Sequence, residues 1–225
     1  MKILCVSDQI DPLVYSSSIK ERYKDIDFVI SAGDLPMEYL DFIVSSLNKP
    51  VYFVFGNHNL NEFGLYHKNL DIQAQNKAQP LLNYAFSHGA TYIGFRTARE
   101  GNILMAGVSG SLRYNKGLNQ YTDRQMRWKL FKLVPRLILN KLRYGRYLDI
   151  FVTHASPEGI HDKNDPCHKG FASFIWFMKT FHPAYLIHGH IHLYDLQDIR
   201  VSQYNKTTVI NAYSHFILDT GDIRS

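Results

Sequence analysis

The chain has few cysteines and no long hydrophobic run, and both shortages limit what it can be. Its two cysteines, Cys5 and Cys167, do not form the dense disulfide framework of small secreted proteins. No apolar stretch approaches the length of a transmembrane helix, which needs about 18 residues. The apolar run after Lys2 is also too short for the core of a signal peptide. We therefore expect a cytoplasmic protein.

The sequence also lacks internal repeats, low-complexity tracts and linker-like stretches. A chain of 225 residues can bury one substantial core, so we expect residues 1–225 to form a single domain. Its 45% apolar and 20% charged residues are typical of a globular enzyme. The net charge of +5 and the pI near 9.1 favour an anionic partner, either a phosphorylated substrate or a nucleic acid. Nothing in the pattern indicates an oligomeric state.

Five short apolar segments run directly into residues that bind metals or phosphate. Short apolar runs bounded by turn residues are typical of buried strands. In open α/β sheets, functional groups gather beyond the carboxyl ends of such strands. Carboxylate, amide and imidazole groups that meet there suit divalent cations such as Mn, Fe or Zn. The segments are 3–8, 28–34, 51–58, 150–154 and 185–192.

Further helices and strands are expected between these segments. Apolar residues at helical spacing predict helices, and alternating ones predict strands. The expected helices are 15–23, 37–47 and 170–181; the expected strands are 103–108, 92–95 as its pairing partner, and a meander over 200–219.

The motifs at the strand ends resemble those of the calcineurin-like metallophosphoesterase superfamily. That family carries D-x-H, G-D, G-N-H-D/E, a strand ending in H, and G-H-x-H, in this order. Here they stand as Asp8-Gln9-Ile10, Gly33-Asp34, Gly56-Asn57-His58-Asn59, His154 and Gly189-His190-Ile191-His192. The resemblance implies an α/β fold in which two packed mixed β-sheets are flanked by helices.

The resemblance also implies a role for each matching residue. Two divalent metals would share Asp34, which bridges them. His58 would bind no metal but would contact phosphate and protonate the leaving oxygen, so His58 and Asp34 are the expected catalytic residues. The ligands would be Asp8, Asp34 and His192 at the first metal, and Asp34, Asn57, His154 and His190 at the second.

Two positions depart from the family's pattern. Asn59 stands where an acid usually follows the G-N-H motif, and Ile10 stands where the family places a histidine ligand. Isoleucine cannot coordinate a metal, so six of the usual seven protein ligands remain. We therefore expect one tight and one weaker site. Water is a better replacement for the missing ligand than Asp11, which is one position away and would point differently.

Loops near the strand ends are candidates for substrate contacts. Residues 153–162 read T-H-A-S-P-E-G-I-H-D, which resembles a T-H-x-P-P-x-G-x-x-D run in some members of the superfamily. Side chains on this loop could touch substrate or could equally hydrogen-bond the loop to itself. The candidates are His161, Asp162 and His168 on this loop, and Arg113 and Tyr114 after the strand at 103–108.

The segment 124–146 carries eight basic side chains, and no acid stands between Asp123 and Asp149. Pro135 should kink or interrupt a helix there. Such a segment could face a membrane surface or a nucleic acid. We favour a solvated basic helix packed on a sheet, because its apolar stripe is needed for burial. That stripe would consist of Trp128, Phe131, Leu137 and Ile138.

These observations predict a metal-dependent phosphohydrolase that cleaves a phosphomonoester or phosphodiester with metal-activated water. A small phosphorylated substrate is expected. Two alternatives stay open. Ile10 supports a protein-binding module with a degenerate metal site, although such a module would not require Asp34, Asn57, His58 or the G-H-x-H motif. The other alternative is a nuclease that binds nucleic acid through 124–146.

Overall fold

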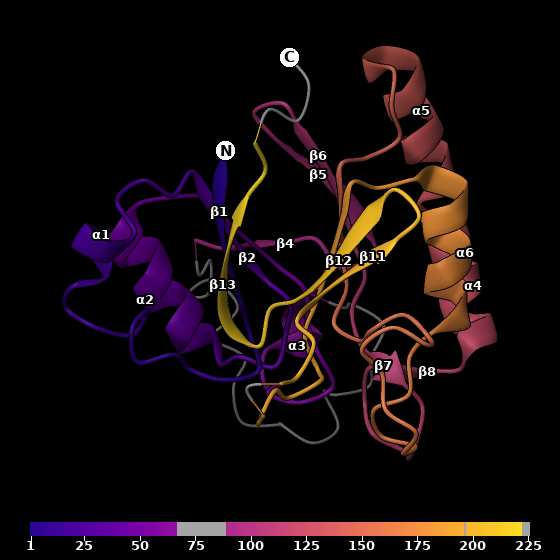
Figure 1. The fold of residues 1–225 in the computed structure, drawn as a ribbon, viewed down its shortest axis with the longest axis horizontal. Coiled ribbons are helices and arrows are strands. Elements are labelled where there is room, and N and C mark those ends of the chain that lie inside the picture. The colour runs from indigo at the N-terminus through magenta and orange to yellow at the C-terminus, as the bar shows by residue number, and fades with distance from the viewer. Residues whose placement is uncertain (67–88, 196, 222–225) are drawn as a thin grey trace.

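Two large mixed sheets form the centre of the molecule (Figure 1). The structure is a computed structural model and describes residues 1–66, 89–195 and 197–221. The first sheet has the order β13-β1-β2-β3-β4, with β1 Lys2–Ser7, β2 Phe28–Ser31, β3 Val51–Phe53, β4 Thr91–Tyr92 and β13 Ser214–Asp219. The second has the order β11-β12-β10-β9-β6-β5, with β5 Arg96–Glu100, β6 Ile103–Gly107, β9 Ile150–Val152, β10 Tyr185–His188, β11 Val201–Tyr204 and β12 Thr207–Asn211. A small third sheet pairs β7 Ser111–Leu112 with β8 Gln120–Tyr121.

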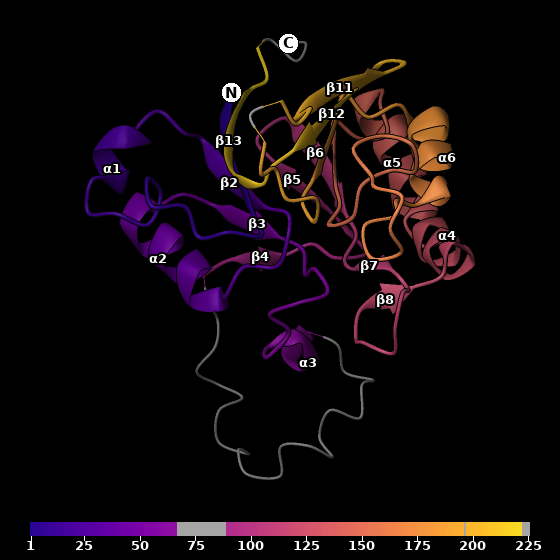
Figure 2. The same ribbon diagram turned by 60° about the horizontal axis from the view of Figure 1, so that its bottom comes forward.

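Helices cover the outer faces of both large sheets, on opposite sides of the molecule (Figure 2). The predicted α/β fold with two packed mixed sheets flanked by helices is therefore confirmed. A short α3, Phe63–Tyr66, follows β3. The first sheet is covered by α1 Ile19–Arg22 and α2 Met37–Leu47, and the second by α4 Asp123–Phe131, α5 Val134–Tyr144 and α6 Ala172–Phe181.

Strand β1 shows why the central strands are apolar at every position. Ile3 and Cys5 belong to the layer between the two sheets, whereas Leu4 and Val6 belong to the layer beneath α1 and α2. Successive side chains of a strand point to opposite faces. Because protein covers both faces here, neither side of the strand can be polar. Continuous apolar runs therefore mark the strands whose ends carry the motifs.

Two of the expected strand pairings are only partly right. Of the segment 92–95, Gly94 bridges to Gly107 at the end of β6, but β6 pairs along its length with β5 and β9. Residue 92 belongs to β4 in the first sheet, because the chain crosses between the sheets after β4. The tail forms no simple meander either. β11 and β12 make a hairpin, but β13 leaves them and pairs antiparallel with β1 in the first sheet. Local alternation does not say which sheet a strand joins.

The basic segment forms two helices, α4 and α5, rather than one kinked helix. Pro135 lies in the first turn of α5, where its missing N–H costs no hydrogen bond. The expected single buried stripe is wrong: Leu137 is fully buried, but Trp128 is 63% exposed and Ile138 is 48% exposed. The break between the helices separates their faces, and Ile138 lies about 100° around the helix from Leu137. None of the helices in the described part of the chain has the length and apolar character needed to span a bilayer.

The layer between the sheets should carry much of the stability. Ile150 on β9 is fully buried in that layer, whereas Ile217 on β13 is 47% exposed. Ile150→Ala removes packed methyl groups and should lower the free energy of unfolding by about 2–5 kcal/mol. The matched Ile217→Ala should cost about 1 kcal/mol or less. Urea unfolding of metal-free protein, followed by circular dichroism, measures both. Equal losses would contradict the layered core.

Candidate metal centre

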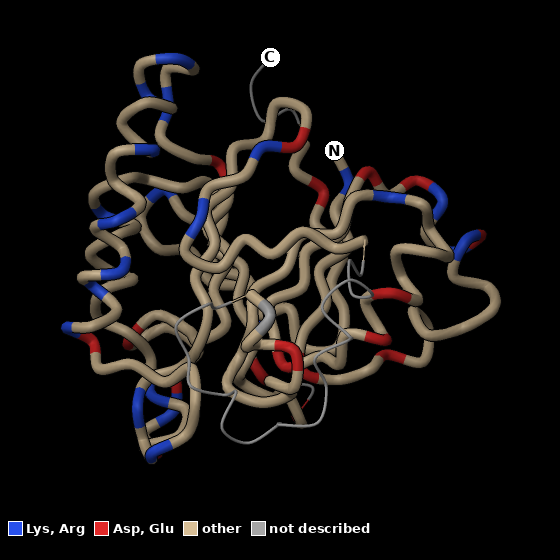
Figure 3. Tube along the Cα trace, turned by 180° about the vertical axis from the view of Figure 1, so that it is seen from behind, with Lys and Arg blue, Asp and Glu red and all other residues tan. Residues whose placement is uncertain are grey.

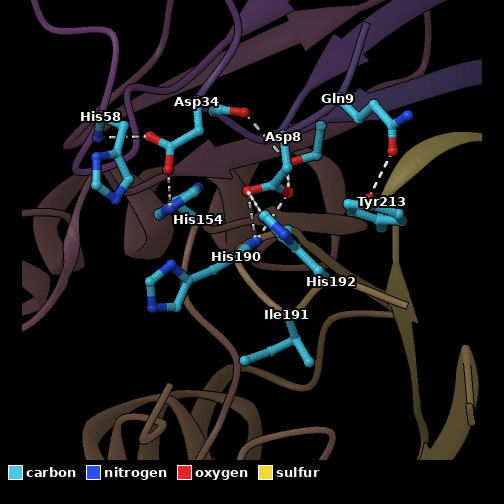
Figure 4. A network of polar contacts seen from close by, with 12 residues as sticks. Asp8, Gln9, Asp34, His58, His154, His190, Ile191, His192 and Tyr213 are labelled. Carbon is cyan, nitrogen blue, oxygen red and sulfur yellow. Dashed lines mark hydrogen bonds and ion pairs between the residues drawn. The ribbon is translucent and has the colours of Figure 1, made fainter. Parts of the chain in front are cut away.

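The ends of five strands deliver the candidate ligands to one region (Figure 4). Strands β1, β2 and β3 run parallel to one another, and so do β9 and β10. Their carboxyl ends therefore gather at one edge of each sheet, as in other α/β proteins. Asp8 follows β1, Asp34 follows β2, Asn57 follows β3, His154 follows β9, and His190 and His192 follow β10.

Three of these residues have a left-handed backbone. The φ angle is 64° at Asp8, 58° at Asp34 and 67° at His190. Such angles are uncommon outside glycine and cost about 1–3 kcal/mol each. They turn the chain sharply just beyond the strand ends. Strained backbone at three converging acidic and imidazole groups is typical of a functional site.

The glycines of the motifs allow the strand ends to approach one another closely. A Cβ atom on Gly56 would lie 2.0 Å from Asp34 Oδ1, and one on Gly189 would lie 1.8 Å from Ser7 Oγ. Neither position can hold a larger residue without displacing the loops that carry the ligands. The glycines of G-N-H and G-H-x-H thus have a packing role beside the ligands.

Asp34, His154 and His190 form the compact part of the site. Each offers a ligand atom, and these atoms lie within 4.8 Å of one another. Asp34 Oδ2 is 3.2 Å from His154 Nε2, and the rings of His154 and His190 are 4.9 Å apart. All three residues are buried, and one comes from the first sheet and two from the second. This donor set suits a borderline divalent cation.

Hydrogen bonds to the backbone fix which ring nitrogen of each histidine can bind a metal. His154 Nδ1 donates to the carbonyl of Ala32 at 2.8 Å, so Nε2, beside Asp34, is the nitrogen that can bind a metal once it gives up its proton. His190 Nε2 donates to the carbonyl of Cys167 at 2.7 Å, which leaves Nδ1. A second partner of this kind is usual for metal-binding histidines, because it sets the tautomer and the ring orientation.

Two buried atoms in this cluster lack a hydrogen-bond partner, and a cation would supply one. They are Asn57 Oδ1 and His154 Nε2, and the latter has only the ion-pair contact with Asp34 Oδ2 at 3.2 Å. The amide nitrogen of Asn57 donates to the Tyr114 hydroxyl at 3.2 Å, so its oxygen is left free. Buried polar atoms are rarely left unpartnered. The residues present therefore fit a metal ion held by Asp34, Asn57, His154 and His190.

The second group, Asp8 and His192, is more open. The Asp8 carboxylate is buried and accepts hydrogen bonds from the Ser7 hydroxyl at 2.6 Å and from the His190 backbone N–H at 2.9 and 3.0 Å. His192 is 40% exposed at its side chain, and its Nε2 lies 4.0 Å from Asp8 Oδ1. Its Nδ1 is hydrogen-bonded to the Tyr194 hydroxyl at 2.6 Å. Ile191, between the two histidines, points away from the carboxylates (Figure 4).

No side chain close in sequence replaces the missing histidine at Ile10. Ile10 is 41% exposed. The Asp11 carboxylate is already engaged by the Ser214 hydroxyl at 2.5 Å, by His215 Nδ1 at 2.6 Å and by the Leu13 N–H at 2.7 Å. These bonds turn Asp11 toward β13. Asp11 would have to give up all three partners to coordinate a metal.

Burial and mutual attraction shape the ionisation of the compact cluster. Burial disfavours charge on both Asp34 and His154, but their attraction prevails and shifts the pKa of Asp34 to about 2 and that of His154 to about 9. Burial, helped by repulsion from His154, lowers the pKa of His190 to about 3, so its imidazole is neutral. Burial raises the pKa of Asp8, and the charge on Asp34 adds to this effect.

His58 lies beside Asp34 on the side away from Asp8 (Figure 4). Its backbone N–H donates to Asp34 Oδ1 at 2.7 Å, and its side chain is exposed. Asn59, which replaces the usual acid, donates its side-chain amide to the backbone carbonyl of Asp34 at 2.8 Å. The G-N-H-N turn thus makes two hydrogen bonds to Asp34, and the imidazole of His58 faces solvent.

The loop after His154 mostly binds to itself and to its neighbours. The Asp162 carboxylate accepts from the N–H groups of Gly159 and Gly170, which closes the loop. His161 Nδ1 is 2.8 Å from Nε2 of the buried His188, and its Nε2 is 2.8 Å from the Ser202 hydroxyl. Both ring nitrogens of His161 are therefore occupied. The structure places Asp162 and His161 in structural contacts.

The other substrate candidates lie closer to the metal ligands. The ring of His168 is 5.5 Å from that of His190, and Asp165 orients it through Nδ1 at 2.8 Å. The Tyr114 hydroxyl holds the Asn57 amide. The Arg113 guanidinium donates to the Gln120 carbonyl at 3.2 Å in the small β7–β8 sheet. His168 and Tyr114 thus border the cluster, whereas Arg113 is tied to β8.

Several residues at the site carry no local sequence signal. The Tyr213 ring lies 4.9 Å from the His192 ring at a tilt of 33°, and its hydroxyl donates to Gln9. Asn119 donates its amide to the Gly56 carbonyl at 2.6 Å. Tyr213 reaches the site only because β13 pairs with β1, where Ser214 faces Ser7. No spacing in the sequence indicates these contacts.

Solved structures resemble this chain in fold. One crystal structure superposes with a TM-score of 0.62 at 15% identity, covering 97% of this chain and 94% of that chain. The protein TT1561 of Thermus thermophilus gives 0.58 at 12% identity, covering 95% and 89%. GAP50 of Plasmodium, described as the anchor in the inner membrane complex, gives 0.50 at 12% identity, covering 94% and 70%. At such identities the likeness shows the fold alone.

The sequence itself matches a family. Comparison with curated protein sequences gives no match. The family of calcineurin-like phosphoesterases matches residues 1–194, which include all six candidate ligands and His58. Its general activity is metal-dependent hydrolysis of phosphoesters, and the cluster of Asp34, His154 and His190 agrees with it. With the fold and the metal-binding cluster both in place, this chain belongs to the calcineurin-like phosphoesterase family.

Proposed function

We propose that this protein is a metal-dependent phosphohydrolase that cleaves a small phosphomonoester or phosphodiester. One observation carries the proposal: the ligand atoms of Asp34, His154 and His190 converge within 4.8 Å, beside the unpartnered Asn57 Oδ1. A buried donor cluster with an unpaired acceptor is suited to hold a cation, which metal-dependent hydrolysis requires. Mn, Fe and Zn all suit its nitrogen and oxygen donors.

Each residue of the site would have a separate role in the reaction. Bound cations would neutralise the charge on the phosphate oxygens and activate a water molecule for attack. Asp34, fixed by the His58 and Asn59 amides, would bridge the two metal positions. The exposed imidazole of His58 would hold a proton and pass it to the leaving oxygen, a step that typically contributes about 10²–10⁴-fold in rate. His168 and Tyr114, at the border of the cluster, would contact substrate.

A binding module with a degenerate metal site is the second candidate, and Ile10 is the observation that favours it. The loss of one histidine leaves Asp8 and His192 as the unshared ligands of the first metal, and His192 is 40% exposed at its side chain. A module of this kind would show no phosphatase or diesterase activity on chromogenic esters under any metal. Hydrolysis that disappears with chelation separates the two candidates.

Activity should depend on divalent metal and on Asp34 above the other ligands. Asp34→Asn should lower turnover by at least about a hundredfold, and by more than His192→Asn, because only Asp34 serves both metals. Chelation followed by addition of Mn should restore the wild type. The measurements are steady-state rates with p-nitrophenyl phosphate and bis-p-nitrophenyl phosphate. Hydrolysis by the metal-free protein would overturn the mechanism.

Proton delivery by His58 should show in the choice of leaving group. His58→Ala should lose most activity on alkyl phosphates, whose leaving oxygen needs a proton, and less on p-nitrophenyl esters. Metal content, measured by elemental analysis, should stay near that of the wild type. His182→Asn, at the exposed left-handed C-cap of α6, is a matched control and should leave both activities unchanged. Equal losses on both substrates, or loss of metal, would indicate a structural role.

The two metal positions should differ in affinity. Asp34, His154 and His190 are available at one position together with the unpartnered Asn57, but only Asp8, the shared Asp34 and the exposed His192 at the other. At limiting metal the protein should hold mostly one ion, and a second should enter at higher concentration or with phosphate. Ile10→His should strengthen the weaker position. Calorimetric titration tests this, and two equally tight ions in the wild type would show that another group replaces the missing histidine.

A further inference from the structure

The outer surface of α4 and α5 exposes large apolar side chains. Trp128 is 63% exposed and Phe131 43% on α4. On α5, Ile138 is 48%, Leu139 54% and Leu142 79% exposed. Single exposed apolar residues are common, but a group along two consecutive helices indicates an interaction surface. These five residues are called the α4–α5 face below.

The exposed residues of α5 lie opposite the side that packs on the protein. Leu137 faces the core and is fully buried. At about 100° per residue, Leu139 and Leu142 fall on the far side of the helix, with Ile138 next to them. Helix α5 is therefore apolar on its buried side and apolar again on its outward side. Packing against the sheet explains the first set only.

The aromatic residues of α4 continue this surface toward α6. The rings of Trp128 and Phe131 are 5.9 Å apart, and Phe131 is 5.0 Å from Trp176 on α6. The Arg127 guanidinium lies over the Trp176 ring at 4.9 Å. Aromatic rings beside a cation are well suited to a boundary between water and an apolar phase.

Positive charge borders the α4–α5 face and acidic charge is nearly absent from it. Figure 3 shows Lys and Arg along the outer helices and little negative charge there. Helices α4, α5 and α6 contain one acid, Asp123, whose carboxylate caps the N–H of Ser173. On α5, Arg136 and Arg143 are exposed beside the leucines. An apolar stripe bordered by arginines complements an apolar phase that carries anionic groups.

We propose that the α4–α5 face docks this protein onto an anionic membrane surface. Leu139, Leu142 and Trp128 would enter the boundary between headgroups and acyl chains, and the arginines would pair with lipid phosphates. Exposed leucine and isoleucine favour a bilayer over nucleic acid, which offers phosphates and base faces but no apolar interior. The protein would lie on the membrane without crossing it. Helix α5 stands at the far end of the molecule from β7 and β8 (Figure 1). The loop between those two strands carries Tyr114 and Asn119, which hydrogen-bond to Asn57 and Gly56 beside the metal centre.

The tryptophans offer a direct readout of docking. The chain has two tryptophans, and both belong to the aromatic group formed with Phe131. Their emission should shift to shorter wavelength when the full-length protein is mixed with vesicles of phosphatidylcholine and phosphatidylglycerol. Vesicles of phosphatidylcholine alone should cause little shift. Co-sedimentation should show the same preference, and binding should weaken as salt is added.

Matched variants separate the face from the rest of the surface. Leu139→Ser/Leu142→Ser should weaken partition onto anionic vesicles at least about tenfold. Arg136→Gln/Arg143→Gln should weaken it about fivefold for each charge removed. The controls are Leu13→Ser/Leu118→Ser, both 45% exposed elsewhere, and Lys20→Gln/Arg22→Gln on α1. Both controls should bind like the wild type. All these side chains are exposed, and circular dichroism verifies folding.

Three outcomes would overturn the proposal. The first is no binding to anionic vesicles, and the second is binding that the leucine and arginine variants leave unchanged. The third is a different occupant of the face. Light scattering that shows a dimer split by the leucine variant, without vesicle binding, would identify a second copy of the chain. Binding to RNA or DNA that the arginine variant abolishes, again without vesicle binding, would identify a nucleic acid.

Discussion

The contact between Asp34 and His154 is the interaction on which the site depends. Asp34 comes from the first sheet and His154 from the second, and their side chains meet at 3.2 Å in a buried environment. The same imidazole donates to Ala32, which lies two positions before Asp34. Two buried charges are costly unless each is well partnered. The pair therefore links the carboxyl ends of the strands in the two sheets. A cation bound there would replace the proton between Asp34 and His154.

The rest of the fold brings the other candidate ligands close to Asp34 and His154. Left-handed backbone at Asp8, Asp34 and His190 turns the chain beyond each strand end, and Gly56 and Gly189 let the loops approach without a clash. Around the pair, carbonyl groups hold the two imidazoles in the tautomers that metal binding needs. The rigid sheets keep these groups in place before any ligand arrives. Preorganised ligands lose little freedom on binding, which favours both affinity and catalysis.

The site is uneven for a reason visible in the structure. The metal position formed by Asp34, His154 and His190 consists of buried side chains. The other depends on Asp8, which already accepts from two donors, the Ser7 hydroxyl and the His190 N–H. It also depends on His192, which is partly exposed and hydrogen-bonded to Tyr194. The absence of a histidine at residue 10 adds to this difference. Substrate phosphate would complete the more open position, and occupancy by the first metal would then be coupled to substrate binding.

The sequence by itself determined the family, the layered fold and the strands that carry the motifs, because a strand buried on both faces is apolar throughout and its ligand follows at the end. It also located helix 37–47 and the break at Pro135. Only the tertiary structure decided which sheet β4 and β13 join, and hence that the Tyr213 ring lies against His192. The same holds for His161, which bonds to His188 and Ser202, and for the apolar side chains of 128–142 that stay exposed. The local sequence pattern indicates how much apolar surface a segment must bury. Which other segments it packs against is decided by long-range contacts.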